Sequence, residues 1–290
     1  RIMEILLKKL YQIPAGLMGY ATSSSIIFAE LFATTAKNII LFKNVNLFKK
    51  EIFSRNNLLN FIVVAKRYKK FPLFSVWAEL FSRVPALISS IMIIKFFGQN
   101  ILGYYGLTLM VLALPSTLIS GSVSEAFMPR AARAKHEGKH TELLEKIYLR
   151  LIVLLIFPFM ILGLFGSELF VFVFGSQWAE SGMIARVLIF YIFFEIIFSP
   201  SLSLIDIMEK QELNLIKSIS NIIIVFLAFY LGSLYNDFYL SLWIITFFQS
   251  LLLILIGSYM MRLMRFPFLL MTTKLIKYFG ICIILGGLAK

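Results

Sequence analysis

The chain has 290 residues, of which 60% are hydrophobic, and its mean hydropathy is +0.88. A soluble domain of this size does not expose so much apolar surface, so the composition excludes a soluble globular protein. The formal net charge of +13 would suit a nucleic-acid partner. However, the basic residues occupy alternate polar segments, a pattern that is typical of membrane proteins and argues against nucleic-acid binding.

Seven apolar stretches are each long enough to cross a bilayer, because about 20 helical residues cover a hydrocarbon core of roughly 30 Å. An eighth stretch begins near Leu275 and is cut off by the end of the chain. The sequence therefore predicts an all-α, polytopic membrane protein with about seven complete transmembrane helices and a truncated eighth. In chain order, the complete spans are 14–42, 73–97, 101–128, 147–166, 183–207, 213–233 and 238–262.

Basic and non-basic loops alternate between these spans. Lys and Arg occur in loops 43–72, 129–146, 208–212 and 263–274, whereas 98–100, 167–182 and 234–237 have none. The positive-inside rule places the basic loops on the cytoplasmic side. Three N-terminal charges, Arg1, Lys8 and Lys9, would then lie outside. Because the chain begins with Arg and stops inside a span, we expect a fragment that lacks both ends.

The lengths of the loops predict the domain organisation. The longest connection is 43–72, and its residues 58–71 form an amphipathic pattern that indicates a helix lying at the membrane interface. The other connections are short, which favours one antiparallel bundle. We therefore expect an N-terminal helix from another bundle (1–42), a basic linker (43–72), a six-helix unit (73–262), and a loop with the start of a further helix (263–290).

Ionisable residues inside the spans are the candidate functional residues, because a charge at the bilayer centre costs about 2.5–3.5 kcal/mol on insertion scales. Glu30 lies near the middle of its span. Arg83 lies near the middle of the next span, on a stripe with Ser75, Glu79, Ser82, Ala86, Ser89 and Ser90. Glu195 lies at the centre of span 183–207, on a stripe with Tyr191, Ser199, Ser203 and Asp206.

Two interpretations of these stripes stay open. In the first, Glu79 and Arg83 neutralise each other as an i, i+4 pair, and Glu195 is protonated and hydrogen-bonded inside the bundle. In the second, both stripes line a polar translocation cavity. The substrate-binding candidates are then Arg83, Glu79, Ser82, Ser90, Tyr191 and Ser199. The candidates for coupling to a proton or Na⁺ are Glu195, Glu79, Glu30 and Asp206.

Residues 136–140 read His-Glu-Gly-Lys-His, which formally matches the H-E-x-x-H zinc motif of metalloproteases. On a helix, His136 and His140 would share one face and could bind zinc. The motif lies in a charged loop, however, and Gly138 disfavours a helix by about 1 kcal/mol. A solvated loop without metal is the expected structure, and no cofactor is expected apart from a coupling ion.

Several segments follow one another in an order and spacing that match a known family. They are KRYKKFPLFS (66–75), FFGQNILGYYGL (96–107), LPSTLISGSVSEAFMPRAARAKHEGK (114–139), FGSQWAESGMIARVL (174–188) and SPSLSLIDIMEKQ (199–211). In these segments the chain resembles bacterial polysaccharide-unit flippases. Those proteins are O-antigen and capsule exporters of the multidrug/oligosaccharidyl-lipid/polysaccharide superfamily.

The resemblance implies two six-helix lobes with a central cavity, of which 73–262 would be the C-terminal lobe. It also implies a non-enzymatic protein of the bacterial inner membrane that moves undecaprenyl-pyrophosphate-linked oligosaccharides between leaflets. Its expected partners are that lipid-linked substrate, membrane lipids, and the polysaccharide polymerase and glycosyltransferases. The alternatives are a cation-coupled multidrug antiporter, a lipid II flippase, a structural membrane protein and, more remotely, a zinc intramembrane protease.

Overall fold

In this computed structural model, the chain forms two compact units, Arg1–Tyr68 and Lys69–Lys290. The structure describes residues 71–121 and 140–263, together with the single residues Thr35, Val63, Lys66 and Thr273. The predicted span 14–42, all but a few residues of the linker 43–72, and nearly all of 264–290 lie outside the described residues. The predicted division into domains therefore stays a prediction.

Six helices in the described part are long and apolar enough to cross a membrane, and no strand occurs among these residues. They match the six predicted spans of 73–262 one for one, which confirms the all-α membrane class. In chain order the elements are η2 (Phe71–Ser75), α4 (Val76–Phe97), α5 (Gln99–Pro115), η3 (Ser116–Ser120), α7 (His140–Phe174), η4 (Ser176–Trp178), α8 (Ala179–Ile207), α9 (Glu212–Leu234) and α10 (Phe238–Leu263).

The loop between α7 and α8 is shorter than the sequence predicts. Residues 167–182 were expected to form a loop, but α7 continues to Phe174 and α8 begins at Ala179. The helix bends instead of ending, because Phe165 has non-helical dihedral angles (φ −118°, ψ 24°). The expected loop 129–146 is also too long, since α7 begins at His140. The sequence Thr-Glu-Leu-Leu-Glu-Lys that follows consists mostly of good helix formers.

Glycines with positive φ make two of the turns at one end of the bundle. Gly98 (φ 94°) joins α4 to α5, and Gly175 (φ 99°) follows α7. Residues without a Cβ adopt such angles at no steric cost. The third turn at this end is Tyr235–Asp237, and none of the three turns carries Lys or Arg. Lys210 lies in the α8–α9 turn at the opposite end, as the predicted alternation of charge requires.

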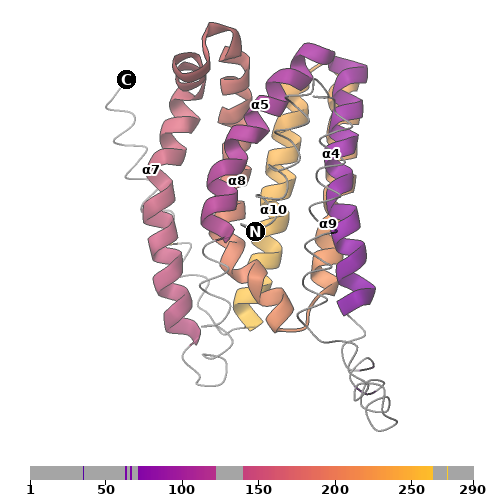
Figure 1. Ribbon diagram of the computed structural model, residues 1–290, viewed down its shortest axis with the longest axis vertical. Helices are drawn as coiled ribbons and strands as arrows, with labels where there is room; N and C mark the ends of the chain where they lie inside the picture. Colours follow the sequence, from indigo (N-terminus) through magenta and orange to yellow (C-terminus); the bar gives the residue numbers. More distant parts are fainter. Residues whose placement is uncertain are drawn as a thin grey trace. The chain divides into compact units, whose positions relative to one another are not determined.

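Five of the helices pack in a ring, with neighbours in the order α4, α9, α10, α8 and α5. Helix α7 packs against α8. Figure 1 shows that α5 begins beside α4 at one end of the bundle and crosses over to α8 toward the other end. Along much of the outside, large apolar side chains such as Leu87, Ile91, Phe157 and Phe172 are exposed. This apolar surface is what a bilayer requires of a spanning bundle.

Small residues allow the helix backbones to approach closely. A Cβ added to Gly182 of α8 would overlap the carbonyl of Gly166 in α7, and one added to Gly257 of α10 would overlap the ring of Phe198 in α8. Close contact at small residues replaces the hydrophobic driving force that is missing between helices in lipid. The core of the unit is therefore built around α8, which contributes to both contacts.

We expect Gly182→Ala to destabilise the unit by about 1–3 kcal/mol, because backbone atoms cannot move aside for the added methyl group. The matched control is Gly106→Ala in α5, where an added Cβ meets nothing within 4 Å. This control should be neutral or slightly stabilising, because Ala favours a helix over Gly. The measurement is thermal unfolding of both variants in detergent. Equal midpoints for the two variants would contradict the packing argument.

Candidate functional site

The first polar group in the spans is an ion pair on α4. The Arg83 Nη2 atom lies 2.7 Å from Glu79 Oε1, and the two side chains are 78% and 68% exposed, respectively. Arg83 is eleven residues past Pro72, which places it about 17 Å along the span at 1.5 Å per residue. The pair therefore lies near mid-depth, on a face of α4 that the rest of the described unit does not cover.

Three of the four serines of the α4 stripe are satisfied by their own helix, whereas the Ser75 hydroxyl is buried and has no hydrogen-bond partner among the described residues. Ser82 donates to the Glu79 carbonyl at 2.7 Å, Ser89 to Pro85 at 2.9 Å and Ser90 to Ala86 at 2.9 Å. A hydroxyl that bonds to the carbonyl three or four residues earlier needs no other partner. These three serines are therefore compatible with a helix in lipid, and the charged pair is not.

Coverage of this stripe changes along α4. Ser82 and Ser89 lie seven residues apart and share a face, yet Ser82 is exposed and Ser89 is buried. The difference follows from the course of α5, whose Tyr105 hydroxyl contacts the Ser89 side chain near the Gly98 turn. Farther from that turn, α5 has moved across to α8 (Figure 1). The half of the stripe that holds the ion pair is thus left uncovered.

The second polar group centres on Glu195 of α8, whose side chain is half-buried. Ser116, the first residue of η3, donates its hydroxyl to Glu195 Oε2 at 3.2 Å. The Tyr191 hydroxyl, one turn earlier on α8, lies near this carboxylate. The predicted proximity of Tyr191 and Glu195 is therefore present in the structure, and the contact joins α8 to the end of α5.

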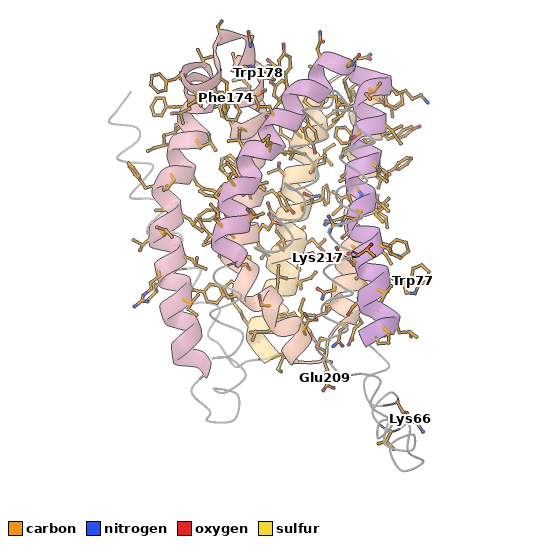
Figure 2. The ribbon with its side chains drawn as sticks, in the orientation of Figure 1. Lys66, Trp77, Phe174, Trp178, Glu209 and Lys217 are labelled. Atoms are coloured by element: carbon orange, nitrogen blue, oxygen red, sulfur yellow. The ribbon has the colours of Figure 1, made fainter. Side chains whose placement is uncertain are left out.

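Lys217 of α9 is the charge that complements Glu195, and sequence reasoning missed it. Its half-buried ammonium group is attracted to Glu195, although no carboxylate in the described residues is close enough to form an ion pair with it. Figure 2 places Lys217 in the lower half of the bundle, between α10 and α4 in that view. The sequence pattern that could have identified Lys217 is its place in an apolar helix, on the same face as Asn214 and Asn221.

The other predicted site residues are more dispersed. Ser199 is buried and donates to the Ile196 carbonyl of its own helix at 2.8 Å, and Asp206 is exposed near the end of α8. Within the parts that the structure describes, no hydrogen bond or ion pair joins Glu79 or Arg83 to Glu195. Glu30 and His136 lie outside those parts, and His140 is the first residue of α7. Nowhere in the described ranges do three His, Cys, Asp or Glu side chains gather to hold a metal.

Polar contacts between helices fix the surroundings of the site. Tyr148 of α7 hydrogen-bonds to Ser201 of α8, and the Tyr239 hydroxyl of α10 donates to Glu180 of α8 at 2.6 Å. Ser218 of α9 donates to the Ala78 carbonyl of α4 at 2.9 Å. Each contact satisfies a group that would otherwise be costly in hydrocarbon. They hold α8 and α9, and with them Glu195 and Lys217, in fixed positions.

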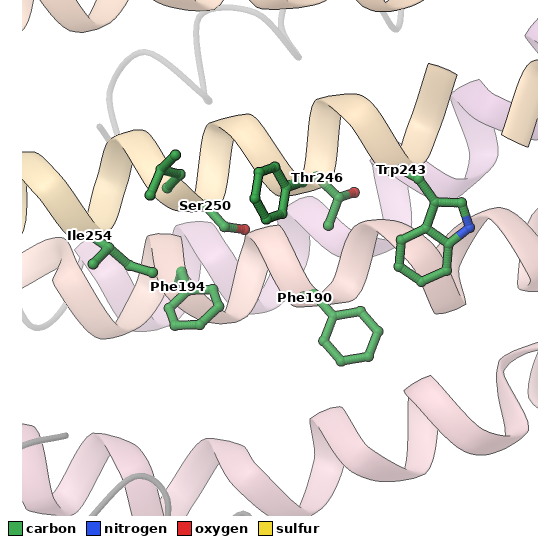
Figure 3. Close-up of a pocket in the computed structure, with 8 residues that line it drawn as sticks. Phe190, Phe194, Trp243, Thr246, Ser250 and Ile254 are labelled. Carbon is green, nitrogen blue, oxygen red and sulfur yellow. The ribbon is translucent and has the colours of Figure 1, made fainter. Parts of the chain in front are cut away.

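A different kind of surface lies between α8 and α10. Phe190 and Phe194 of α8 and Trp243 of α10 contribute to a groove of about 310 Å³ (Figure 3). Its lining is almost entirely apolar, apart from Thr246 and Ser250. Such a groove accommodates hydrocarbon and offers no group that would bind a charged ligand.

We expect the effects of Glu195→Gln and Lys217→Gln on stability to be coupled by about 0.5–3 kcal/mol, because removal of either charge leaves the other uncompensated in a low-dielectric region. The double variant should be less destabilised than the sum of the single variants. The measurement is unfolding in detergent over a double-mutant cycle. The control is a second cycle that combines Glu195→Gln with Lys210→Gln, since Lys210 lies in the α8–α9 turn. The effects of these two substitutions should be additive. Additive effects of Glu195 and Lys217 would refute the proposed complementarity.

Comparison with known proteins gives one positive result. The family model described as "polysaccharide biosynthesis protein" matches residues 1–183, which is more than half of the chain. Neither the comparison with curated proteins nor that with solved structures found a match. The family match covers three of the five segments whose resemblance was noted from the sequence and part of a fourth, and the six apolar helices independently indicate a membrane protein. The chain therefore belongs to the polysaccharide biosynthesis protein family and is a membrane protein of polysaccharide synthesis.

Proposed function

We propose that this protein is a flippase that moves undecaprenyl-pyrophosphate-linked oligosaccharide units across the bacterial inner membrane, for the synthesis of O-antigen, capsule or exopolysaccharide. Membership of the family supports a role in polysaccharide synthesis. A bundle of apolar helices with charges inside its spans supports transport. In an alternating-access cycle, the polar site would open first to the cytoplasmic side and then to the outer side.

The observation that carries this proposal is the exposed Glu79–Arg83 pair near mid-depth of α4. An ion pair at this depth does not face acyl chains without a large cost, so it requires water or a polar surface beside it. Three exposed apolar residues, Trp77, Leu80 and Ile91, lie on another face of the same helix. Helix α4 therefore has a lipid-compatible face and a polar face, as a helix that lines a translocation path requires.

The parts of the substrate match the chemistry of this polar face. Arg83 presents a planar fork of donors that suits phosphate oxygens, and Glu79 neutralises it while the site is empty. The hydroxyl groups of Ser82, Ser90 and Tyr191 are candidates for contacts with sugars. The polyprenyl chain would stay in the lipid. Glu195, Glu79, Glu30 and Asp206 are the candidates for coupling transport to a proton or Na⁺.

We expect Arg83→Ala to reduce surface polysaccharide about tenfold or more, because a hydrogen bond to a charged group contributes about 1.5–3 kcal/mol. Arg83→Lys should retain part of the activity, since it keeps the charge but loses the fork. The measurement is the amount of surface glycan made by the intact protein in its native cells, at equal protein abundance. Lys95→Ala, at the exposed end of the same helix, is the matched control and should have no effect.

Normal glycan in the Arg83→Ala cells would exclude Arg83 from the mechanism. Drug resistance on overexpression, without a glycan phenotype, would instead indicate a cation-coupled multidrug antiporter. Lysis on depletion of the protein would indicate a lipid II flippase. These three outcomes separate the proposed function from its nearest relatives.

A further inference from the structure

The end of α5 is a break in an otherwise regular bundle. Helix α5 ends at Pro115, which has no backbone N–H, and the next five residues form the π-helical segment η3. The Thr117 hydroxyl donates to the carbonyls of Ala113 at 2.8 Å and Leu114 at 3.2 Å. Side-chain donors thus replace part of the regular hydrogen-bond ladder. Wide turns of this kind are rare and frequently occur at functional sites.

Only part of this segment packs against the bundle, where Ile119 lies against the hydrophobic core. Leu114 and Leu118 are 59% and 69% exposed, and Thr117 is exposed as well. The side that is covered faces α8. On that side, Ser116 of η3 donates a hydrogen bond to Glu195 Oε2 of α8 at 3.2 Å. Among the described residues, this is the side-chain hydrogen bond that joins η3 to another helix. The position of η3 therefore depends on the packing of Ile119 and on this one hydrogen bond.

The acceptor of this bond is held by groups from two helices. The Tyr191 hydroxyl of α8 lies near the same carboxylate, and Lys217 of α9 attracts it. A hydrogen bond to a charged acceptor is roughly twice as strong as one between neutral groups. Because Glu195 lies in an apolar helix that packs against α5, α7 and α10, its carboxylate is fixed relative to the rigid part of the bundle.

We propose that Glu195 is a positioning residue whose carboxylate pins the π-helical end of α5 against α8, and that release of the Ser116 contact frees this segment to move. Pro115 supplies the break about which the segment moves, and Lys217 stabilises the carboxylate in the pinned state. The contact itself does not depend on the proposed function. Its consequence for transport does, because alternating access requires segments with two positions.

The test measures the mobility of η3 directly. A spin label on Leu118→Cys reports on the segment, and a label on Met110→Cys, which is 72% exposed and lies before Pro115, is the matched control. Both are placed in the intact protein with Cys282→Ser, reconstituted in lipid. We expect Ser116→Ala and Glu195→Ala each to at least double the mobile fraction of the label at position 118. The label at 110 should be unchanged, which also shows that the bundle is folded.

Conservative variants separate pinning from general destabilisation. Ser116→Thr keeps the hydroxyl group and should restore the mobility of the unsubstituted protein. Glu195→Gln keeps an accepting oxygen without the charge and should give an intermediate mobile fraction. Unchanged mobility at 118 in both Ser116→Ala and Glu195→Ala would overturn the proposal, and so would an equal increase at 110.

Transport of the lipid-linked oligosaccharide is a second, separate measurement. If Glu195 acts through η3, Ser116→Ala should lower the maximal rate severalfold and leave the substrate concentration for half-maximal rate unchanged. If neither the unsubstituted protein nor any variant moves this substrate, the proposed function is contradicted. The spin-label result would still decide whether Glu195 holds η3 in place.

Discussion

The cost of placing charge in hydrocarbon governs the arrangement of this protein. Glu79, Arg83, Glu195 and Lys217 are four of the ionisable side chains that lie within the spans. At about 2.5–3.5 kcal/mol each, their combined cost is comparable to the net stability of a whole domain, about 5–15 kcal/mol. Glu79 and Arg83 form an ion pair within α4, whereas Glu195 accepts a hydrogen bond from Ser116 and attracts Lys217 of α9 without forming an ion pair.

The remaining structure divides into a rigid part and a less constrained part. Glycine contacts and interhelical hydrogen bonds hold α7, α8, α9 and α10 closely together. Helix α5 differs, because it leaves α4 halfway and ends in a π-helical segment with exposed apolar residues. Because α5 leaves α4 and packs against α8, the polar face of α4 is uncovered and the end of α5 is held by Glu195 of α8. A single feature of the packing therefore exposes the candidate site and supplies an element that can move.

Much of the fold could be predicted from the sequence, because membrane spans depend mainly on local hydropathy. The Glu79–Arg83 pair was also predictable, since an i, i+4 spacing fixes the neighbours on a helix. The end of α7 was not, because a Gly-Ser-Glu stretch lowers hydropathy without breaking the helix. The relation between Glu195 and Lys217 was missed since it depends on how α8 and α9 are placed on either side of α10. Likewise, nothing local to Ser82 and Ser89 shows that α5 covers only one of them.

The most direct test of the account is a spin-label scan along α4, from Val76 to Phe97, in lipid. Collisions with a water-soluble nickel complex report a polar surrounding, and collisions with oxygen report hydrocarbon. We expect nickel accessibility to peak at Glu79, Ser82 and Arg83, and oxygen accessibility to peak at Trp77, Leu80 and Ile91. High oxygen and negligible nickel accessibility on both faces would contradict it, because the ion pair would then lie in lipid.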